Sequence, residues 1–285
     1  MPNNSCSRIL VTGANGQLGQ CLKDVLASSS LFASRQDLDI TSQEEVLRYF
    51  KNHKPSLCIN TAAYTQVDLA EEESDQAYLI NAEALKNLCL ACNELNITLV
   101  HISTDYVFDG KKDEAYSEDD LVGPLGIYGK SKLAGEEIVQ SMANSYLIMR
   151  TSWVYSEYGK NFVKTMLRLA NQKDEISVVH DQWGNPTYAK DLALALKKIS
   201  EKNLEGIKEL YHYSHDGKIS WAQFAEEIFR QKGLKTKVRP IETKDFPSNT
   251  PRPSNSSFSK DKIKSDFGIK IPDWKEGLSR CLECL

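Results

Sequence analysis

The segment Ile9-Leu10-Val11-Thr12-Gly13-Ala14-Asn15-Gly16-Gln17-Leu18-Gly19 carries most of the information about the fold of this 285-residue chain. An apolar run of strand length leads into glycines spaced three residues apart, and a helix-like segment begins at Gln17. In such a turn one glycine permits a tight bend, one lets the backbone approach a pyrophosphate, and one lets the helix pack closely on the strand. The N–H groups and partial positive charge of a helix N-terminus suit phosphates. The pattern therefore predicts a dinucleotide site, and its alternative is an ordinary strand-to-helix turn.

Strand-length apolar runs alternate with helix-length amphipathic segments through the first half of the chain. The predicted strands are residues 8–12, 31–34, 57–61, 99–103 and 146–150, and the predicted helices are residues 17–27, 42–52, 74–95 and 128–143. Such alternation is typical of a parallel sheet that helices cover on both faces. We expect an α/β fold, a Rossmann-like doubly wound parallel sheet, over residues 1–160.

The pattern is looser after Trp153. Helices are predicted near residues 161–172, 189–200 and 221–231, with Ser220 as a cap, strands near 176–179 and 209–213, and loops over 181–188 and 246–257. Ligands of doubly wound sheets bind over the strand ends. We therefore expect residues 161–285 to form mainly a smaller α/β substrate-binding lobe, with some segments returning to the first domain.

The charge balance argues against several classes of partner. The 35 Lys and Arg residues face 39 Asp and Glu residues, and the net charge of -4 is spread without a basic block. Nucleic acid and anionic membranes are therefore poor partners. No apolar run approaches the ~20 residues of a membrane span, and the polar first residues do not resemble a signal peptide. We expect a soluble, cytoplasmic protein.

The chain has seven cysteines, an odd number with irregular spacing. This pattern predicts reduced thiols rather than a disulfide framework. Two CxxC pairs, Cys89 with Cys92 and Cys281 with Cys284, have a spacing found in zinc sites. The first pair lies inside a predicted helix, whereas zinc sites usually use short turns. We expect buried or incidental thiols and no metal site.

A residue that reads the adenosine ribose is expected about 20 residues after the glycines. The stretch Ser34-Arg35-Gln36-Asp37-Leu38-Asp39 gives mixed signals there. Arg35 suits the 2′-phosphate of NADPH, or is a solvated surface charge. Asp37 or Asp39 suits a free ribose hydroxyl or the adenine edge. The choice between NADPH and NADH stays open at this stage.

Tyr128 and Lys132 lie one helical turn apart, so both side chains leave the same helix face. A phenol is a poor acid–base group at neutral pH unless its anion is stabilised, and the charge of Lys132 can supply that. The pair predicts a proton donor to a carbonyl oxygen during hydride transfer. Thr104, at the end of the fourth predicted strand, is placed to hydrogen-bond the same oxygen. The alternatives are a packed tyrosine with a solvated lysine, and a threonine that caps the strand.

Taken together, several segments resemble the dTDP-4-dehydrorhamnose reductases of the extended short-chain dehydrogenase/reductase group. They are the glycine-rich turn and residues 60–68, 103–110, 128–136 and 150–155, and the likeness continues through 161–167 and 181–187. The resemblance implies hydride transfer from NADPH or NADH to the C4 ketone of dTDP-4-dehydro-β-L-rhamnose, which gives dTDP-β-L-rhamnose.

The resemblance also implies roles for individual residues. Tyr128 would donate the proton, Lys132 would tune it and bind the ribose, and Thr104 would assist. Substrate contacts are expected from Thr104, Asp105 and Trp153, although Trp153 also suits a core position. Amide and guanidinium groups suit phosphate oxygens, so Asn161 and Arg252 are candidates for the substrate diphosphate. Cofactor contacts are expected from Gly13, Asn15, Gly16, Gln17, Leu18, Asp39, Ile40, Ala62, Ala63, Tyr64, Thr65, Tyr128 and Lys132.

Other interpretations stay open. A non-catalytic, dinucleotide-binding regulatory subunit similar to the methionine adenosyltransferase beta subunits retains much of the same pattern. Another nucleotide-sugar oxidoreductase or epimerase of the same group is a nearer alternative. Some members of the resembling family use Mg²⁺ at a dimer interface, but the first helical turn after Gly16 has no carboxylate, so we carry over no metal. We expect a dTDP-sugar as partner, and a homodimer stays open.

Overall fold

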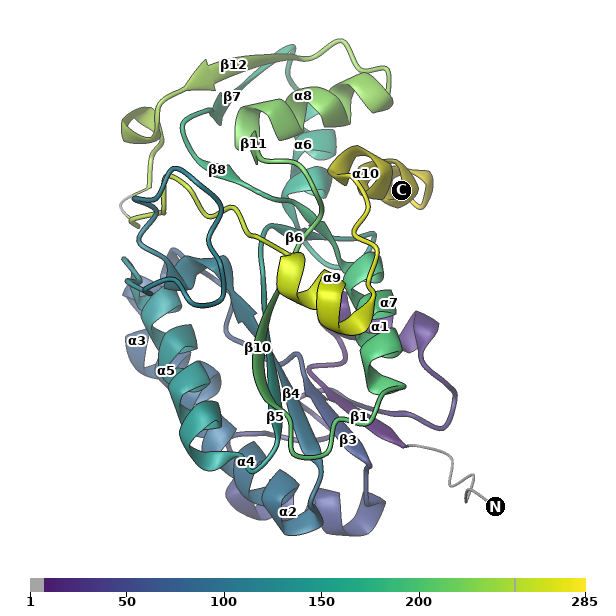
Figure 1. The fold of residues 1–285 in the computed structure, drawn as a ribbon. Helices are drawn as coiled ribbons and strands as arrows, with labels where there is room; N and C mark the ends of the chain where they lie inside the picture. The colour runs from purple at the N-terminus through teal and green to yellow at the C-terminus, as the bar shows by residue number, and fades with distance from the viewer. Residues whose placement is uncertain (1–7, 249) are drawn as a thin grey trace.

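The computed structural model describes residues 8–248 and 250–285. Its centre is a parallel sheet of six strands in the order β10-β5-β4-β3-β1-β2 (Figure 1). The strands are β1 (Ile9–Thr12), β2 (Leu31–Ala33), β3 (Leu57–Asn60), β4 (Thr98–Thr104), β5 (Tyr146–Thr151) and β10 (Lys208–Tyr213). The strand order reverses between β1 and β3, and ligands of doubly wound sheets bind at such a switch point. The predicted Rossmann-like fold is confirmed.

Helices cover both faces of this sheet, because successive strand residues point to opposite faces and both sets are apolar. On one face, Leu10, Cys58 and Leu99 pack under α2 (Gln43–His53), α4 (Ala84–Leu95) and α5 (Ile127–Met142). On the other face, the neighbouring strand residues pack under α1 (Gln17–Val25) and α7 (Ala189–Ser200). Figure 1 shows these two helical layers on opposite sides of the strands.

A second layer of structure lies beyond the carboxyl ends of the strands, at the top of Figure 1. Here β7 (Glu175–Val179) pairs in parallel with β12 (Lys237–Ile241). Around this pair lie α6 (Phe162–Ala170), α8 (Trp221–Gln231) and α10 (Trp274–Glu283), which share an apolar cluster. Two further pairs of two-residue strands are β6 (Val154–Tyr155) with β9 (Thr187–Tyr188), and β8 (Trp183–Gly184) with β11 (Ile219–Ser220).

The chain crosses between these layers more than once. After α6 and β7 it returns as α7 and β10, and after β12 and η4 (Thr243–Asp245) it returns as α9 (Asp261–Phe267), which packs on β10. The division into two domains at residue 160 stays a prediction. Within residues 8–248 and 250–285, no helix combines the length and the apolar content that crossing a bilayer requires.

The predicted helix over residues 74–95 is wrong as a single α-helix. The structure has α3 (Ser74–Tyr78), a π-helical turn η2 (Leu79–Glu83) and then α4. The amide of Asn81 accepts a hydrogen bond from the backbone N–H of Tyr64 (2.8 Å) and donates to the Tyr64 carbonyl (3.1 Å) and to Ser131 Oγ (3.0 Å). A π turn inserts one extra residue into a helix. Here it coincides with the buried Asn81, which links the loop after β3 to α5.

Other local predictions have mixed outcomes. The Ser220 cap is confirmed, because its side chain accepts a hydrogen bond from the backbone of Gln223 in a full capping box. The predicted loop over residues 181–188 contains the short strands β8 and β9. A strand of two residues is too short to show the alternation of apolar and polar side chains by which strands are predicted. The elements β12, α9 and α10 were not predicted from the sequence.

Two leucines of α4 test how this helix packs on the sheet face that α2, α4 and α5 cover. Leu88 is 0 % exposed and Leu90 is 40 % exposed. We expect Leu88→Ala to lower the free energy of unfolding by roughly 2–5 kcal/mol, because it removes buried methyl groups and leaves a cavity. Leu90→Ala is the matched control, with an expected change within about 0.5 kcal/mol. Urea unfolding measures both, and equal losses would contradict the described orientation of α4.

Candidate active site

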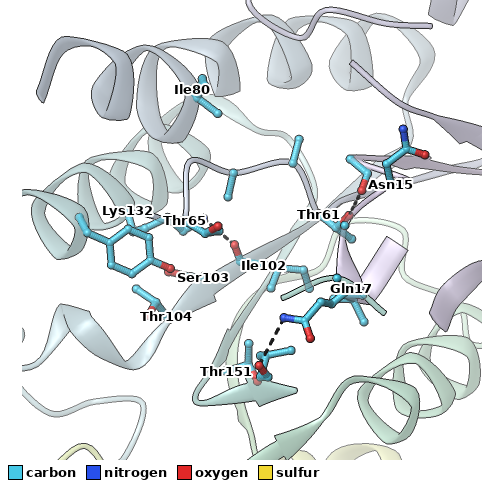
Figure 2. A pocket seen from close by; sticks show the side chains of 18 of the residues that line it. Asn15, Gln17, Thr61, Thr65, Ile80, Ile102, Ser103, Thr104, Lys132 and Thr151 are labelled. Atoms are coloured by element: carbon cyan, nitrogen blue, oxygen red, sulfur yellow. Dashed lines mark hydrogen bonds between the residues drawn. The ribbon is translucent and has the colours of Figure 1, made fainter. Parts of the chain in front are cut away.

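A cavity of about 880 Å³ lies along the carboxyl ends of the parallel strands. It is lined by the glycine-rich turn, by residues that follow β2 and β3, by the end of β4 and by α5. Figure 2 shows the side chains around it, including Asn15, Gln17, Thr61, Thr65, Ile80, Ile102, Ser103, Thr104, Lys132 and Thr151. The cavity therefore brings the glycine-rich turn and the Tyr128–Lys132 pair, which are far apart in the sequence, to one space.

The turn after β1 is built for close approach. Gly13 has φ +68°, and a Cβ at this position would lie 2.5 Å from the backbone nitrogen of Ala62. A Cβ on Gly19 would lie 2.6 Å from the carbonyl oxygen of Gly13, so α1 is seated directly on the turn. No side chain caps the N-terminus of α1 at Gly16, which lines the cavity. The uncapped N–H groups of the first helical turn suit a pyrophosphate.

The residues after β2 distinguish between the acidic candidates. The carboxylate of Asp37 accepts hydrogen bonds from the backbone N–H (2.9 Å) and Oγ (2.6 Å) of Ser34. Asp37 itself does not line the cavity. Asp39 lines the cavity, and hydrogen bonds from Thr41 lower the pKa of its carboxyl, with a further contribution from the charge of Arg35. Arg35 is exposed and lines the same cavity. A cation and a carboxylate thus both face the expected ribose position.

Tyr128 and Lys132 of α5 both line the cavity. Burial raises the pKa of the Tyr128 phenol to about 12, against a hydrogen bond with Thr104 that lowers it. Burial lowers the pKa of Lys132 to about 8, against the charge of Glu136. Lys132 Nζ donates to the carbonyl oxygen of Ile102 (2.7 Å) and lies 3.2 Å from His101 Nε2.

The expected lowering of the Tyr128 pKa by Lys132 is therefore wrong for this structure. Burial removes hydration from the phenolate form of Tyr128, and the hydrogen bond from Thr104 does not make up for this loss. The pKa of the phenol therefore rises. The amine of Lys132 is directed to β4 by its contacts with His101 and Ile102.

Thr104 closes β4 and caps the short helix η3 (Asp105–Val107). Its hydroxyl accepts a hydrogen bond from the backbone N–H of Tyr106 (3.2 Å) and donates to Asp105 Oδ1 (3.1 Å). Ser256, in the loop before α9, donates to Asp105 Oδ2 (2.6 Å). Burial raises the pKa of the Asp105 carboxyl to about 6, although the bonds from Ser256 and Thr104 oppose this. The cavity wall is thus tied to a loop of the second layer.

Trp153 connects the cavity to α8. Its indole stacks on that of Trp221 with ring centroids 3.6 Å apart and an angle of 8° between the planes. Its backbone has φ +47°, a left-handed conformation that costs energy in a residue other than glycine. A Cβ on Gly184 would lie 2.7 Å from the Trp153 ring. Trp153 is held from two sides while it lines the cavity.

Helix α5 is fixed to the sheet by a buried ion pair. The carboxylate of Glu136 accepts from Arg150 Nε (2.9 Å) and Nη2 (2.6 Å) and from Ser103 Oγ (2.5 Å). Arg150 comes from β5 and Ser103 from β4, so one carboxylate joins three elements. Removing one partner of such a pair is costly, because the other charge stays buried without compensation.

Most of the predicted site residues line this cavity, and three do not. Those that do are Gly13, Asn15, Gly16, Gln17, Leu18, Asp39, Ile40, Ala62, Ala63, Thr65, Thr104, Asp105, Tyr128, Lys132 and Trp153. Tyr64 is tied by its backbone to Asn81. Asn161 caps α6 and donates to Gln17 Oε1 (2.9 Å), and Arg252 pairs with Asp68 (2.6 Å). The cavity gives no support for ligand contacts by these three side chains.

Several residues that line the cavity were not predicted from the sequence, among them Ser34, Ile80, Ser103, Tyr106, Thr151 and Lys160. Thr151 directly follows a predicted strand, so the rule that ligands bind at strand ends would have found it. Ile80 carried no such signal, because it reached the cavity through the unpredicted π turn.

None of the cysteines in residues 8–248 and 250–285 lines this cavity. Cys58, Cys89 and Cys92 are buried, and burial raises the pKa of Cys89 to about 12. Cys281 is buried and Cys284 is exposed. Among residues 8–248 and 250–285, no group of three or more His, Cys, Asp or Glu side chains is placed to hold a metal ion.

Known proteins resemble the chain over nearly its whole length. The model of the family described as "RmlD substrate binding domain" matches residues 7–285. A dTDP-4-dehydrorhamnose reductase of Aggregatibacter actinomycetemcomitans is 42% identical, over 95% of this chain and 97% of that protein. The spore coat polysaccharide biosynthesis protein SpsK of Bacillus subtilis is also 42% identical, over 97% of both chains.

A solved structure resembles the chain equally well. The dTDP-4-dehydrorhamnose reductase of Bacillus anthracis in complex with NADP matches with a TM-score of 0.92 and 41% identity, over 97% of this chain and 99% of that one. These matches confirm the resemblance inferred from the motifs. The chain belongs to the RmlD substrate binding domain family.

Proposed function

We propose that the chain reduces the C4 ketone of dTDP-4-dehydro-β-L-rhamnose with NADPH or NADH, giving dTDP-β-L-rhamnose. The observation that carries the proposal is the cavity that joins the glycine-rich turn to Tyr128, Lys132 and Thr104. The relatives named as dTDP-4-dehydrorhamnose reductases, and the one that is in complex with NADP, support the same activity.

The residues present fit a nicotinamide dinucleotide. Gly13 leaves a space that a Cβ would fill, and Gly16 leaves the first turn of α1 uncapped beside the cavity. We assign the pyrophosphate to this turn and the adenosine ribose to Arg35 and Asp39. When bound, the nicotinamide supplies the hydride.

Tyr128 acts as the proton donor to the C4 oxygen in this proposal. Because its pKa is about 12, the phenol carries its proton at neutral pH and is ready to donate it as negative charge develops on the substrate. When the substrate is bound, the Thr104 hydroxyl turns its single proton from Asp105 Oδ1 to the same oxygen and holds it beside Tyr128. Lys132 lies one turn further along α5, and in this proposal its ammonium form supplies the proton that restores the Tyr128 phenol.

The sugar site lies where the second layer meets the carboxyl ends of β4 and β5. Asp105, after β4, and Trp153, after β5, line the cavity there and contact Ser256 and Trp221, and we assign them to the sugar. We further infer that residues 1–160, with α7, β10 and α9, form the cofactor-binding domain and contribute these two residues, and that the rest of residues 161–285 mainly form the lobe that covers the substrate. The proposal also places the protein in the cytoplasm with a dTDP-sugar as its partner.

The direct test of the activity follows the absorbance of the reduced nicotinamide with dTDP-4-dehydro-L-rhamnose as substrate. We expect oxidation that depends on the sugar, with NADPH and NADH measured side by side. Dinucleotide binding without oxidation would overturn the proposal and favour a regulatory subunit.

The role of Tyr128 has a separate test. We expect Tyr128→Phe to lower kcat by roughly 10²–10⁴-fold, because the proton donor is removed, while the dissociation constant for NADPH stays unchanged. Steady-state kinetics and fluorescence titration measure the two quantities. A loss of less than about threefold in kcat would rule out Tyr128 as general acid.

Arg35 tests the cofactor preference. If its guanidinium binds the 2′-phosphate, Arg35→Gln raises the KM for NADPH by about 10-fold or more and leaves the KM for NADH unchanged, since a hydrogen bond to a charged group is lost. Arg48→Gln on the exposed face of α2 is the control. Equal increases for both cofactors would remove Arg35 from the 2′-phosphate site.

Asp105 gives a prediction for stability against pH. Folding raises its pKa from 3.8 to about 6, so the folded chain holds this proton more tightly than the unfolded chain does. The unfavourable contribution of the buried carboxylate is therefore absent below the unfolded pKa, grows between about pH 4 and pH 6, and reaches about 3 kcal/mol above that. We expect the free energy of unfolding of Asp105→Asn, taken relative to that of the wild type, to be higher at about pH 8 than at about pH 4.

Urea unfolding at the two pH values measures this effect. Asp120→Asn is a control of opposite sign, because hydrogen bonds from Lys112 and the Ser117 backbone lower the pKa of Asp120 to about 2. That carboxylate stabilises the folded state above its unfolded pKa, so its removal costs stability at neutral pH. An Asp105→Asn variant with an unchanged pH dependence would contradict the burial of Asp105.

A further inference from the structure

A row of polar side chains crosses the apolar sheet beneath α5. Thr12, Asn60 and His101 are register partners on the adjacent strands β1, β3 and β4. Each is at most 1% exposed. Closer to the amino ends of the same strands, this face carries the apolar residues Leu10, Cys58 and Leu99. Polar groups in such a layer need hydrogen-bond partners, and the row leads from the glycine-rich turn to Lys132.

The direction of the hydrogen bonds in this row is set by Asn60. The backbone N–H of Ala62 lies 3.2 Å from Asn60 Oδ1, and because an N–H can only donate, the amide oxygen must face it. The hydroxyl of Thr12 donates to the same oxygen (2.6 Å). The amide nitrogen of Asn60 therefore points the other way, to His101 Nδ1 at 3.1 Å.

This direction determines which ring nitrogen of His101 carries a proton. An amide NH₂ group has no lone pair to accept with, so His101 Nδ1 must be the acceptor. Burial and the nearby charge of Lys132 both lower the pKa of His101, so the ring is neutral. The single ring proton then lies on Nε2, which is 3.2 Å from Lys132 Nζ.

An Nε2–H directed at an amine distinguishes between the two forms of Lys132. The Nε2–H can donate a hydrogen bond to the lone pair of a neutral amine. An ammonium group has no lone pair, so its N–H groups and the Nε2–H repel each other. The remaining bond of Lys132 Nζ, to the Ile102 carbonyl, is available to either form.

Other charged groups around Lys132 are already engaged. On α5, Glu136 favours the ammonium form but is paired with Arg150 of β5 and Ser103 of β4, and Tyr128 is the neighbouring phenol. Asp105 of η3 is hydrogen-bonded to Thr104 and Ser256.

We propose that Asn60 and His101 are positioning residues that hold Lys132 Nζ against the Ile102 carbonyl and, by presenting an Nε2–H, stabilise its neutral amine relative to the ammonium form. The consequence for catalysis rests on the function proposed above. Lys132 in its ammonium form returns one proton to the Tyr128 phenolate, which becomes a phenol again, and the resulting amine accepts the Nε2–H hydrogen bond. Water then protonates the amine, and the hydroxide formed is neutralised by buffer.

The ring nitrogens of His101 test the proposal without any activity measurement. In protein labelled with ¹⁵N-histidine, we expect the wild-type His101 ring to show the pattern of a neutral imidazole protonated on Nε2. His101→Gln identifies its signals among those of the five histidines. A wild-type ring protonated on Nδ1, or on both nitrogens, overturns the proposal.

Asn60→Asp reverses the direction of the row. A carboxylate still accepts from Ala62 and Thr12 but also accepts from His101 Nδ1, so the ring proton moves to Nδ1 and Nε2 becomes an acceptor for the Lys132 ammonium. We expect the ring pattern to reverse and the alkaline limb of kcat/KM to move to higher pH by about one unit. Asn203→Asp is the control, since Asn203 is exposed and only accepts from the backbone N–H of Glu205, which an aspartate also does, and it should change neither quantity.

A reversed ring pattern with an unmoved alkaline limb overturns the link between His101 and Lys132. If the wild type lacks turnover, the proposed function fails, while the wild-type ring spectrum still decides the tautomer. If Asn60→Asp does not fold, the same wild-type spectrum keeps the proposal open to contradiction.

Discussion

The site depends on how closely α5 lies on the carboxyl half of the sheet. A Cβ on Gly135 would collide with the carbonyl oxygen of Asn81, so the helix touches the backbone of the π turn. One residue further on, Glu136 binds Arg150 and Ser103 in a buried cluster. These contacts fix the height and rotation of α5, and therefore the place where Tyr128 and Lys132 meet the cavity. A small shift of this helix would move both groups together.

The same sheet is apolar over most of its area and polar near the carboxyl ends of its central strands. A parallel sheet with both faces covered must bury nearly every strand side chain, so polar residues are tolerated only where partners exist. Thr12 and Asn60 are the last residues of β1 and β3, His101 lies level with them on the longer β4, and Ser103 lies near the end of β4, where α5 and the loops provide those partners. The carboxyl ends of the strands, where dinucleotides bind, are thus also where buried hydrogen bonds orient α5.

Much of the fold could be predicted because its signals are local. The alternation of apolar runs and amphipathic helices follows from burial on both faces, and the glycine spacing follows from steric limits at Gly13 and Gly19. The cavity joins these motifs. What escaped prediction depends on contacts between distant segments. The π turn accompanies the bonds of Asn81 to Tyr64 and Ser131, and the cap of α6 and the link to Gln17 engage Asn161, whose amide therefore does not line the cavity. The upward shift of the Tyr128 pKa reflects burial, which spacing along a helix does not reveal.

In the proposed reaction a hydride passes from the nicotinamide to C4 of a dTDP-4-keto sugar beside Tyr128. This transfer can be followed with NADPH that carries two deuterium atoms at C4 of the nicotinamide, with dTDP-4-dehydro-L-rhamnose as substrate and NMR analysis of the sugar product. We expect dTDP-L-rhamnose that carries deuterium on C4 and on no other ring carbon. A product without deuterium, or with deuterium at another carbon, would contradict it.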